Sequence, residues 1–199
     1  TGLGTDNTIW GGEVLVADYA GFTRAAHLDP VPMPGSAAAI REPWRMAVGH
    51  LQATFGDGDM PADLPLLMDA DPKQLQVLMQ MTQKRINSPL TSSLGRLFDA
   101  VAAIVGLRHR VAFEGQAAME LEMIADDHER GIYDHGWEED EPLTIATAPI
   151  IRAVVADVIH GVAPPVVSAR FHNTLIRLFD ALCIHLEDKT GIERVALSG

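Results

Sequence analysis

Residues 88–106 read Ser-Pro-Leu-Thr-Ser-Ser-Leu-Gly-Arg-Leu-Phe-Asp-Ala-Val-Ala-Ala-Ile-Val-Gly. The apolar side chains of this stretch recur at the spacing of one face of an α-helix, which predicts a helix with one buried side. Ser92 or Ser93 can cap the start of that helix, and Gly106 can end it. The residues of the expected buried face are Leu94, Leu97, Phe98, Val101 and Val105.

A second stripe of small residues runs beside this face and contains one carboxylate. It consists of Gly95, Asp99, Ala102 or Ala103, and Gly106. Small side chains let another helix or a flat ligand approach the backbone. In the first case Asp99 makes a buried hydrogen bond at a helix crossing; in the second it accepts hydrogen bonds from two vicinal hydroxyls, as carboxylates do with ribose.

Closer to the N-terminus, the hydrophobic pattern is typical of β-strands instead. Residues 13–19 and 22–28 predict a β-hairpin with Ala20-Gly21 as its turn. Three prolines at 30, 32 and 34 are expected to end the sheet, because proline cannot donate to a ladder.

The remaining chain is mostly helical in pattern. Helices are expected over 37–51 (interrupted near Pro43), 73–83, 93–105, 115–126, 143–160 and 166–186. The fold class is therefore α/β and rich in helix. We divide residues 1–199 into a glycine-rich loop with a hairpin (1–34), a helical region (35–187) and the start of a strand (188–199).

Composition excludes several functions. The 199 residues are 47% hydrophobic and carry a formal net charge of −12, which disfavours both nucleic acid and anionic lipid as partners. No apolar run is long enough for a membrane span, and a single cysteine, Cys183, allows no intrachain disulfide. A cytoplasmic protein is expected.

Two glycine segments are candidate ligand sites. Gly2 and Gly4 open the chain in a turn-rich run whose backbone N–H groups could cradle a phosphate or an acyl phosphate; an ordinary bulged hairpin is the alternative. Gly115 follows Glu114 and starts a predicted helix, where free N–H donors and the dipole favour an anion; a simple cap is the alternative.

The acidic segment 126–141 is best interpreted as a solvated connecting loop. A weaker hypothesis is a hard-metal site, which lacks any recognised ligand spacing. Its ligands would be Asp126, Asp127, His128 and His135. We assign no metal ligand and no catalytic residue from the sequence.

Several motifs together resemble one family, the HypF carbamoyltransferases of NiFe-hydrogenase maturation, along nearly the whole chain. The matching segments are Thr1–Glu13, Ala17–Tyr19, Ala39–Ala47, Ser88–Ser93, Gly95–Ala102, Glu114–Ala118 and Ala169–His172. The resemblance implies part of a lobe of the actin/Hsp70-like, or sugar-kinase-like, fold. Asn7 departs from the usual glycine, which a turn tolerates because Asn also accepts positive φ.

The resemblance also implies a reaction. The family forms carbamoyl adenylate from carbamoyl phosphate and ATP, and passes the carbamoyl group to the C-terminal cysteine of the partner HypE for synthesis of cyanide ligands. By the same resemblance, Gly2 and Gly4 lie in the phosphate or carbamoyl loop, Asp99 holds the ribose, and Gly115 contacts the nucleoside with Glu114 beside it. The ligands of the family's metal ion are expected outside residues 1–199.

Three further expectations follow. The chain looks like an excised piece, so it should be inactive alone. An O-carbamoyltransferase of a related biosynthetic family, or a non-catalytic lobe that docks the partner protein, remain alternatives. The N-terminal hairpin is also expected to pair with a second copy of the chain, giving a homodimer.

Overall fold

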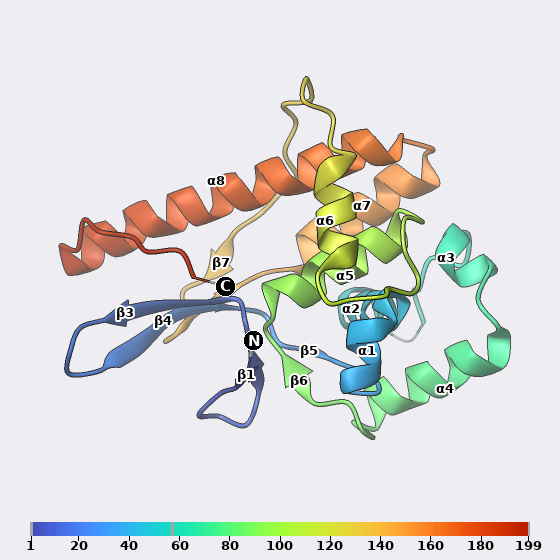
Figure 1. Cartoon of the computed structure of the whole chain (residues 1–199), viewed down its shortest axis with the longest axis horizontal. Coiled ribbons are helices and arrows are strands. Elements are labelled where there is room, and N and C mark those ends of the chain that lie inside the picture. Colours follow the sequence, from blue (N-terminus) through green and yellow to red (C-terminus); the bar gives the residue numbers. More distant parts are fainter. Residues whose placement is uncertain (1, 57, 199) are drawn as a thin grey trace.

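The computed structural model describes residues 2–56 and 58–198, and its strands there form two small mixed sheets beside a cluster of helices (Figure 1). The first sheet has the order β1 (Gly2–Leu3), β2 (Ile9–Trp10), β6 (Leu90–Thr91) and β5 (Val31–Pro32). The second has the order β3 (Glu13–Ala17), β4 (Phe22–Leu28), β8 (Leu143–Ile145) and β7 (Trp137–Glu138). The α/β fold class is confirmed.

The β3–β4 hairpin forms as the sequence predicts, with antiparallel pairing and a register shift between Val14 and Leu15. Strand β4 then pairs in parallel with β8. The expectation of a helix from residue 143 was wrong, because Leu143 and Ile145 are buried on one side of β8 while Thr144 lies between them. Helix α7 begins only at Ala148.

The prolines do not end the sheet. Pro32 lies in β5, opposite Leu90 of β6, at the edge of the first sheet. An edge strand tolerates proline because the missing N–H can face away from the ladder.

Apart from the short α3, which was not expected, the helices follow the expected order. They are α1 (Ala37–Arg41), α2 (Pro43–Phe55), α3 (Pro65–Met68), α4 (Pro72–Gln83), α5 (Leu94–Ile104), α6 (Gln116–Met123), α7 (Ala148–Ile159) and α8 (Pro164–Thr190). The helical region does not end at 187: α8 continues to Thr190, where Gly191 stops it at φ 71°. Residues 192–198 form no strand, contrary to expectation.

The core is centred on the packing of α2 against α5. Met46 and Leu51 from α2, and Leu97 and Val101 from α5, have no exposed surface. Helix α2 also approaches β5 closely at Gly49, where a β-carbon would lie 2.4 Å from the Pro32 carbonyl oxygen. The packing of α2 against α5 holds α5 in place, and α5 carries Asp99.

The segment before β7 is anchored to α7 and α8 by a polar cluster. The Tyr133 hydroxyl donates to Asp157 at 2.9 Å, and Arg170 pairs with the same carboxylate at 2.9 Å. Burial and the neighbouring Asp157 carboxylate raise the pKa of Tyr133 far above its usual range, so the phenol stays protonated and donates.

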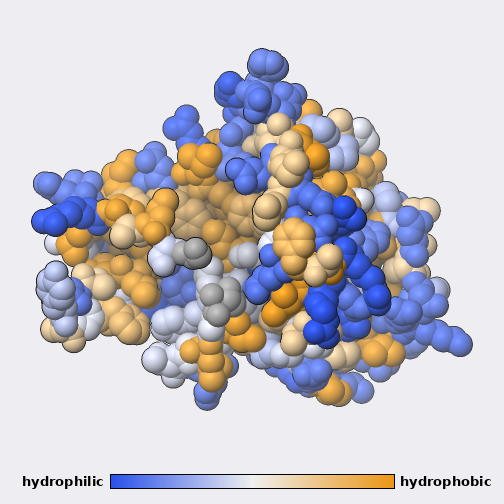
Figure 2. All heavy atoms as spheres, viewed as in Figure 1, coloured by the Kyte–Doolittle hydropathy of each residue, from blue (hydrophilic) through white to orange (hydrophobic). Residues whose placement is uncertain are grey.

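Hydrophobic side chains gather on the face between the β3–β4 hairpin and α8 (Figure 2). Large apolar residues exposed on these elements are Leu15, Phe22, Ile176 and Ile184. Within residues 2–56 and 58–198, no helix is both long and apolar enough to cross a membrane.

Candidate functional site

The Asp99 carboxylate lies on α5 and is almost fully buried, with 3% of its side chain exposed. Arg96, one turn earlier, places its Nη1 2.8 Å from Asp99 Oδ2. The contact is an ion pair rather than an aligned hydrogen bond, because both atoms lack a hydrogen-bond partner. A buried acceptor and a buried donor are thus left with bonding capacity, which is unusual in a packed interior.

Burial raises the pKa of Asp99 to about 6, against the lowering effect of Arg96 and with a further raising contribution from Glu114. Desolvation therefore exceeds the attraction of the neighbouring guanidinium. A carboxyl with such a pKa changes its charge near neutrality, so small changes in its surroundings alter its hydrogen-bonding role.

Glu114 is linked to Asp99 through Arg96, and Gly115 follows Glu114 at the start of α6. The Glu114 carboxylate lies 3.7 Å from Arg96 Nη2 and leaves 66% of its side chain exposed. Gly115 caps α6 in the left-handed conformation, with φ 83°, and a β-carbon there would enter open space. The structure therefore brings three of the five residues singled out from the sequence to one region beside α5.

The opening glycines have different surroundings. A β-carbon on Gly4 would lie 2.1 Å from the indole nitrogen of Trp10, so packing of that ring already requires glycine. A β-carbon on Gly2 would meet nothing. The glycine at position 4 thus has a structural reason to be there, independent of any ligand.

The tip of the β1–β2 hairpin is shaped by Asp6. Its Oδ1 accepts hydrogen bonds from the Thr8 backbone N–H, the Thr8 hydroxyl and the Trp10 indole, at 3.0, 2.7 and 2.9 Å. These bonds, with Thr8 first among them, hold the pKa of Asp6 well below its usual range. The Thr5 and Asp6 amides donate to no acceptor within the described residues, so the hairpin tip offers two free N–H groups.

Arg24 on β4 holds this tip against the rest of the fold. It contacts Asp6 Oδ2 and Glu13 Oε1, each at 2.8 Å, and its guanidinium lies 4.2 Å from the centre of the Trp10 ring. Sequence reasoning missed Arg24, because nothing in the spacing of residues 6, 13 and 24 indicates that their side chains meet.

Glu13 and Ser92 connect the hairpin to the start of α5. Glu13 accepts hydrogen bonds from the Gly11 and Gly12 amides and from the Ser92 hydroxyl. The Leu94 amide, the first of α5, donates to the Gly11 carbonyl at 3.1 Å. The end of the glycine-rich segment is therefore fixed at the N-terminus of the helix that carries Asp99 five residues later.

The acidic loop provides no metal centre within the part of the chain that the structure describes, where no three His, Cys, Asp or Glu side chains are grouped for an ion. Asp126 instead accepts a hydrogen bond from the His128 amide at 2.8 Å, and the His135 ring contacts the Tyr133 carbonyl at 2.8 Å. These groups organise the loop itself.

Polar groups are thus offered to a ligand at three places: the buried Asp99–Arg96 pair, the open N-terminus of α6 and the two free amides of the hairpin tip. The arrangement is suited to positioning, with backbone donors available for developing negative charge.

Comparison with known proteins gives consistent results. A family model described as "Carbamoyltransferase, Kae1-like Domain, second subdomain" matches residues 1–199. The chain is 42% identical to a carbamoyltransferase HypF of Rhodobacter capsulatus and 36% identical to one of Synechocystis, in both cases over its whole length. The chain spans about a quarter of those relatives, 25% and 27% of their lengths.

Solved structures agree. A full-length HypF in a phosphate- and nucleotide-bound form matches with a TM-score of 0.92 and 35% identity, over 99% of this chain and 30% of that one. The HypF of T. kodakarensis matches with a TM-score of 0.79 and 27% identity, over 98% of this chain and 26% of its own.

Proposed function

The chain belongs to the HypF carbamoyltransferase family, and we propose that it forms the nucleoside-binding part of the carbamoyl-transfer site of a longer enzyme. The proposed ligand is carbamoyl adenylate, made from carbamoyl phosphate and ATP. The proposed acceptor is the C-terminal cysteine of a HypE-type partner in NiFe-hydrogenase maturation. The chain alone is expected to be inactive.

The observation that carries this proposal is the buried Asp99 carboxylate, whose Oδ2 keeps bonding capacity beside Arg96. A ribose supplies two vicinal hydroxyls, and a carboxylate is their usual acceptor. Gly115 adds a helix N-terminus with no side chain in the way, which lets the flat face of a nucleoside approach the backbone. An acceptor for the ribose hydroxyls and an unobstructed helix N-terminus together support an adenylate as the ligand.

In the proposed mechanism the adenylate supplies an activated carbamoyl group, and the chain positions it. Asp99 and Gly115 hold the nucleoside, while the free Thr5 and Asp6 amides at the hairpin tip hold the anionic end. Donors fixed in this way stabilise charge on the carbamoyl oxygen while the adenylate leaves. Fixed geometry also replaces a chance encounter with the acceptor thiol.

The family's metal ion has no ligand cluster among the described residues, so no step is assigned to it here. Arg24 and Glu13 act indirectly, because they fix the hairpin tip against α5 without reaching the proposed ligand. They are positioning residues.

The proposal is tested with the full-length protein by measuring carbamoyl transfer to the acceptor protein. Asp99→Ala should abolish transfer, because the ribose contact is lost, while acceptor binding survives. Arg177→Ala, on the exposed side of α8, is the matched control and should transfer at the wild-type rate.

The exposed apolar side chains on β3, β4 and α8 favour a second candidate, a lobe that docks the partner protein. Loss of acceptor binding in Asp99→Ala, with nucleotide affinity unchanged, would support docking and contradict the nucleotide site.

A further inference from the structure

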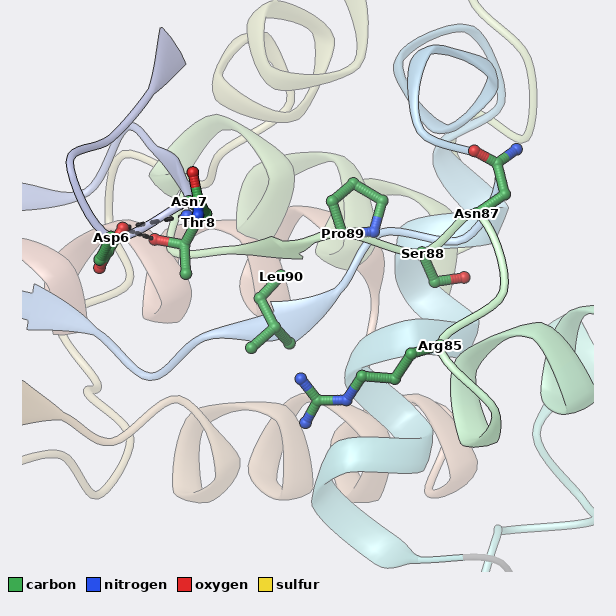
Figure 3. Close-up of a pocket in the computed structure, with 8 residues that line it drawn as sticks. All are labelled: Asp6, Asn7, Thr8, Arg85, Asn87, Ser88, Pro89 and Leu90. Carbon is green, nitrogen blue, oxygen red and sulfur yellow. Dashed lines mark hydrogen bonds between the residues drawn. The ribbon is translucent and has the colours of Figure 1, made fainter.

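A cavity of about 480 Å³ lies between the tip of the β1–β2 hairpin and the segment that joins α4 to β6 (Figure 3). Asp6, Asn7 and Thr8 line one end, and residues 85 and 87–90 line the rest. The cavity therefore borders the hairpin tip at which carbamoyl transfer is proposed, yet none of the residues 85–87 belongs to the site described above.

Among the described residues that line this cavity, Arg85 is the one cation. Its side chain is exposed, and its guanidinium makes no ion pair or hydrogen bond within residues 2–56 and 58–198. Its side chain is directed toward Leu90 (Figure 3), and these two residues also line a neighbouring cavity of about 360 Å³. The chain as a whole carries a net charge of −12, so an unpaired guanidinium that lines a cavity gives this part of the surface a positive charge.

The backbone around Arg85 is held in an uncommon conformation. Arg85 has φ 52° and Asn87 has φ 46°, both in the left-handed region. Asparagine adopts this region readily, whereas for arginine it is strained. The segment is nevertheless fixed by backbone hydrogen bonds from Gly35 to the Asn87 carbonyl and from Met33 to the Pro89 carbonyl, both 2.9 Å.

The one carboxylate of the cavity does not neutralise Arg85. Asp6 is already satisfied by Thr8 and Trp10 and paired with Arg24 at 2.8 Å, so its negative charge is compensated from the opposite side. The side-chain amides of Asn7 and Asn87 have no hydrogen-bond partner among the described residues and add neutral donors.

We propose that Arg85 binds a phosphate group of a substrate, a phosphate ester or acyl phosphate, in the cavity between the hairpin tip and the α4–β6 segment. A guanidinium presents paired N–H donors that match two phosphate oxygens. A phosphate is favoured over a carboxylate because it carries more negative charge at pH 7 and presents three strong acceptor oxygens. This inference rests on the proposed function only for the identity of the substrate.

The direct test is protection of Arg85 from phenylglyoxal in the full-length protein, followed by mass spectrometry of its peptides. Inorganic phosphate and acetate are compared at equal ionic strength, and Arg177, exposed on α8, is the reference within the same molecule. At near-saturating phosphate the modification of Arg85 should slow roughly fivefold or more, by mass action, while Arg177 is unaffected and acetate has little effect.

Equal protection by acetate, no protection by phosphate, or an Arg85 that does not react under any condition would each overturn the proposal. The last result would mean that the rest of the full-length chain covers the cavity.

Kinetics supply the link to catalysis. Arg85→Ala should raise the KM for the phosphate-bearing substrate about tenfold, with kcat unchanged. A change of this size is expected from the loss of one charge-assisted hydrogen bond. Arg85→Lys should recover part of this loss, and Lys84→Ala, which removes a neighbouring exposed charge, should behave as wild type. An unchanged KM in Arg85→Ala would refute the inference. Absence of carbamoyl transfer in the wild-type protein would refute the proposed function, but would leave the phosphate-protection result to stand by itself.

Discussion

Substitution of Arg24 by Met should loosen the glycine-rich hairpin while keeping most of the apolar stem of the side chain. The pair with Asp6 is partly exposed, 41% at Asp6, and contributes only about 0.5 kcal/mol. The pair with Glu13 is nearly buried, 7% exposed at Glu13, and its loss leaves a carboxylate short of one partner.

The loss of stability depends on the hydrogen bonds that Glu13 keeps after Arg24 is replaced. Breaking a buried pair typically costs about 3–5 kcal/mol, but Glu13 keeps hydrogen bonds from Gly11, Gly12 and Ser92, so we expect about 2 kcal/mol here. Loss of the cation–π contact with Trp10 adds about 0.5 kcal/mol. The free energy of unfolding should therefore fall by about 3 kcal/mol in all.

Urea denaturation of the 199-residue chain, followed by tryptophan fluorescence, measures this change. Arg177→Met is the matched control and should stay within about 0.5 kcal/mol of wild type, because Arg177 is exposed on α8. A wild-type free energy of unfolding in Arg24→Met would show that the charge network does not stabilise the hairpin, and the reasoning would fail.

Three further predictions concern individual side chains. Gly4→Ala should lower the free energy of unfolding by about 2 kcal/mol, since its β-carbon would displace the Trp10 ring, while Gly2→Ala, facing open space, should change it little; equal effects in urea denaturation would contradict the packing argument. Tyr133→Phe should cost about 1 kcal/mol through the lost bond to Asp157, against no change for the exposed Tyr19→Phe, and a neutral Tyr133→Phe would refute the anchoring role. Because the pKa of Asp99 is raised from 3.8 to about 6 in the folded chain, its contribution to stability is fully present below about pH 4 and is lost as the pH rises through 6. Urea denaturation at pH 4 and pH 7 should therefore show Asp99→Asn gaining stability relative to wild type at the higher pH, and a pH-independent difference would argue against the raised pKa.

The sequence predicts an element well where the hydrophobic pattern of that element alone determines its structure. Helix α5 follows from its apolar spacing, and the β3–β4 hairpin follows from alternation around Ala20-Gly21. Strand β8 was misassigned because Leu143-Thr144-Ile145, two apolar residues around a threonine just before α7, resembles the first turn of that helix. Only the long-range pairing with β4 distinguishes the two, and pairing partners are not encoded locally.

The site shows the same division. Asp99, Glu114 and Gly115 could be singled out from their own stretches of sequence; Arg96 contacts the first two, and Gly115 is next to Glu114. The roles of Arg24 and Arg85 depend on contacts and cavities between segments far apart in the chain, from the hairpin tip to the α4–β6 segment. Charged residues of this kind look like ordinary surface side chains in a sequence.

The nucleoside site at Asp99 is the central claim, and calorimetric titration of AMP into the folded 199-residue chain tests it most directly, with Asp99→Ala alongside. The account predicts binding in the micromolar to millimolar range that disappears in Asp99→Ala while circular dichroism shows both chains folded. Equal binding by wild type and Asp99→Ala, or no binding by the folded wild-type chain, would contradict it.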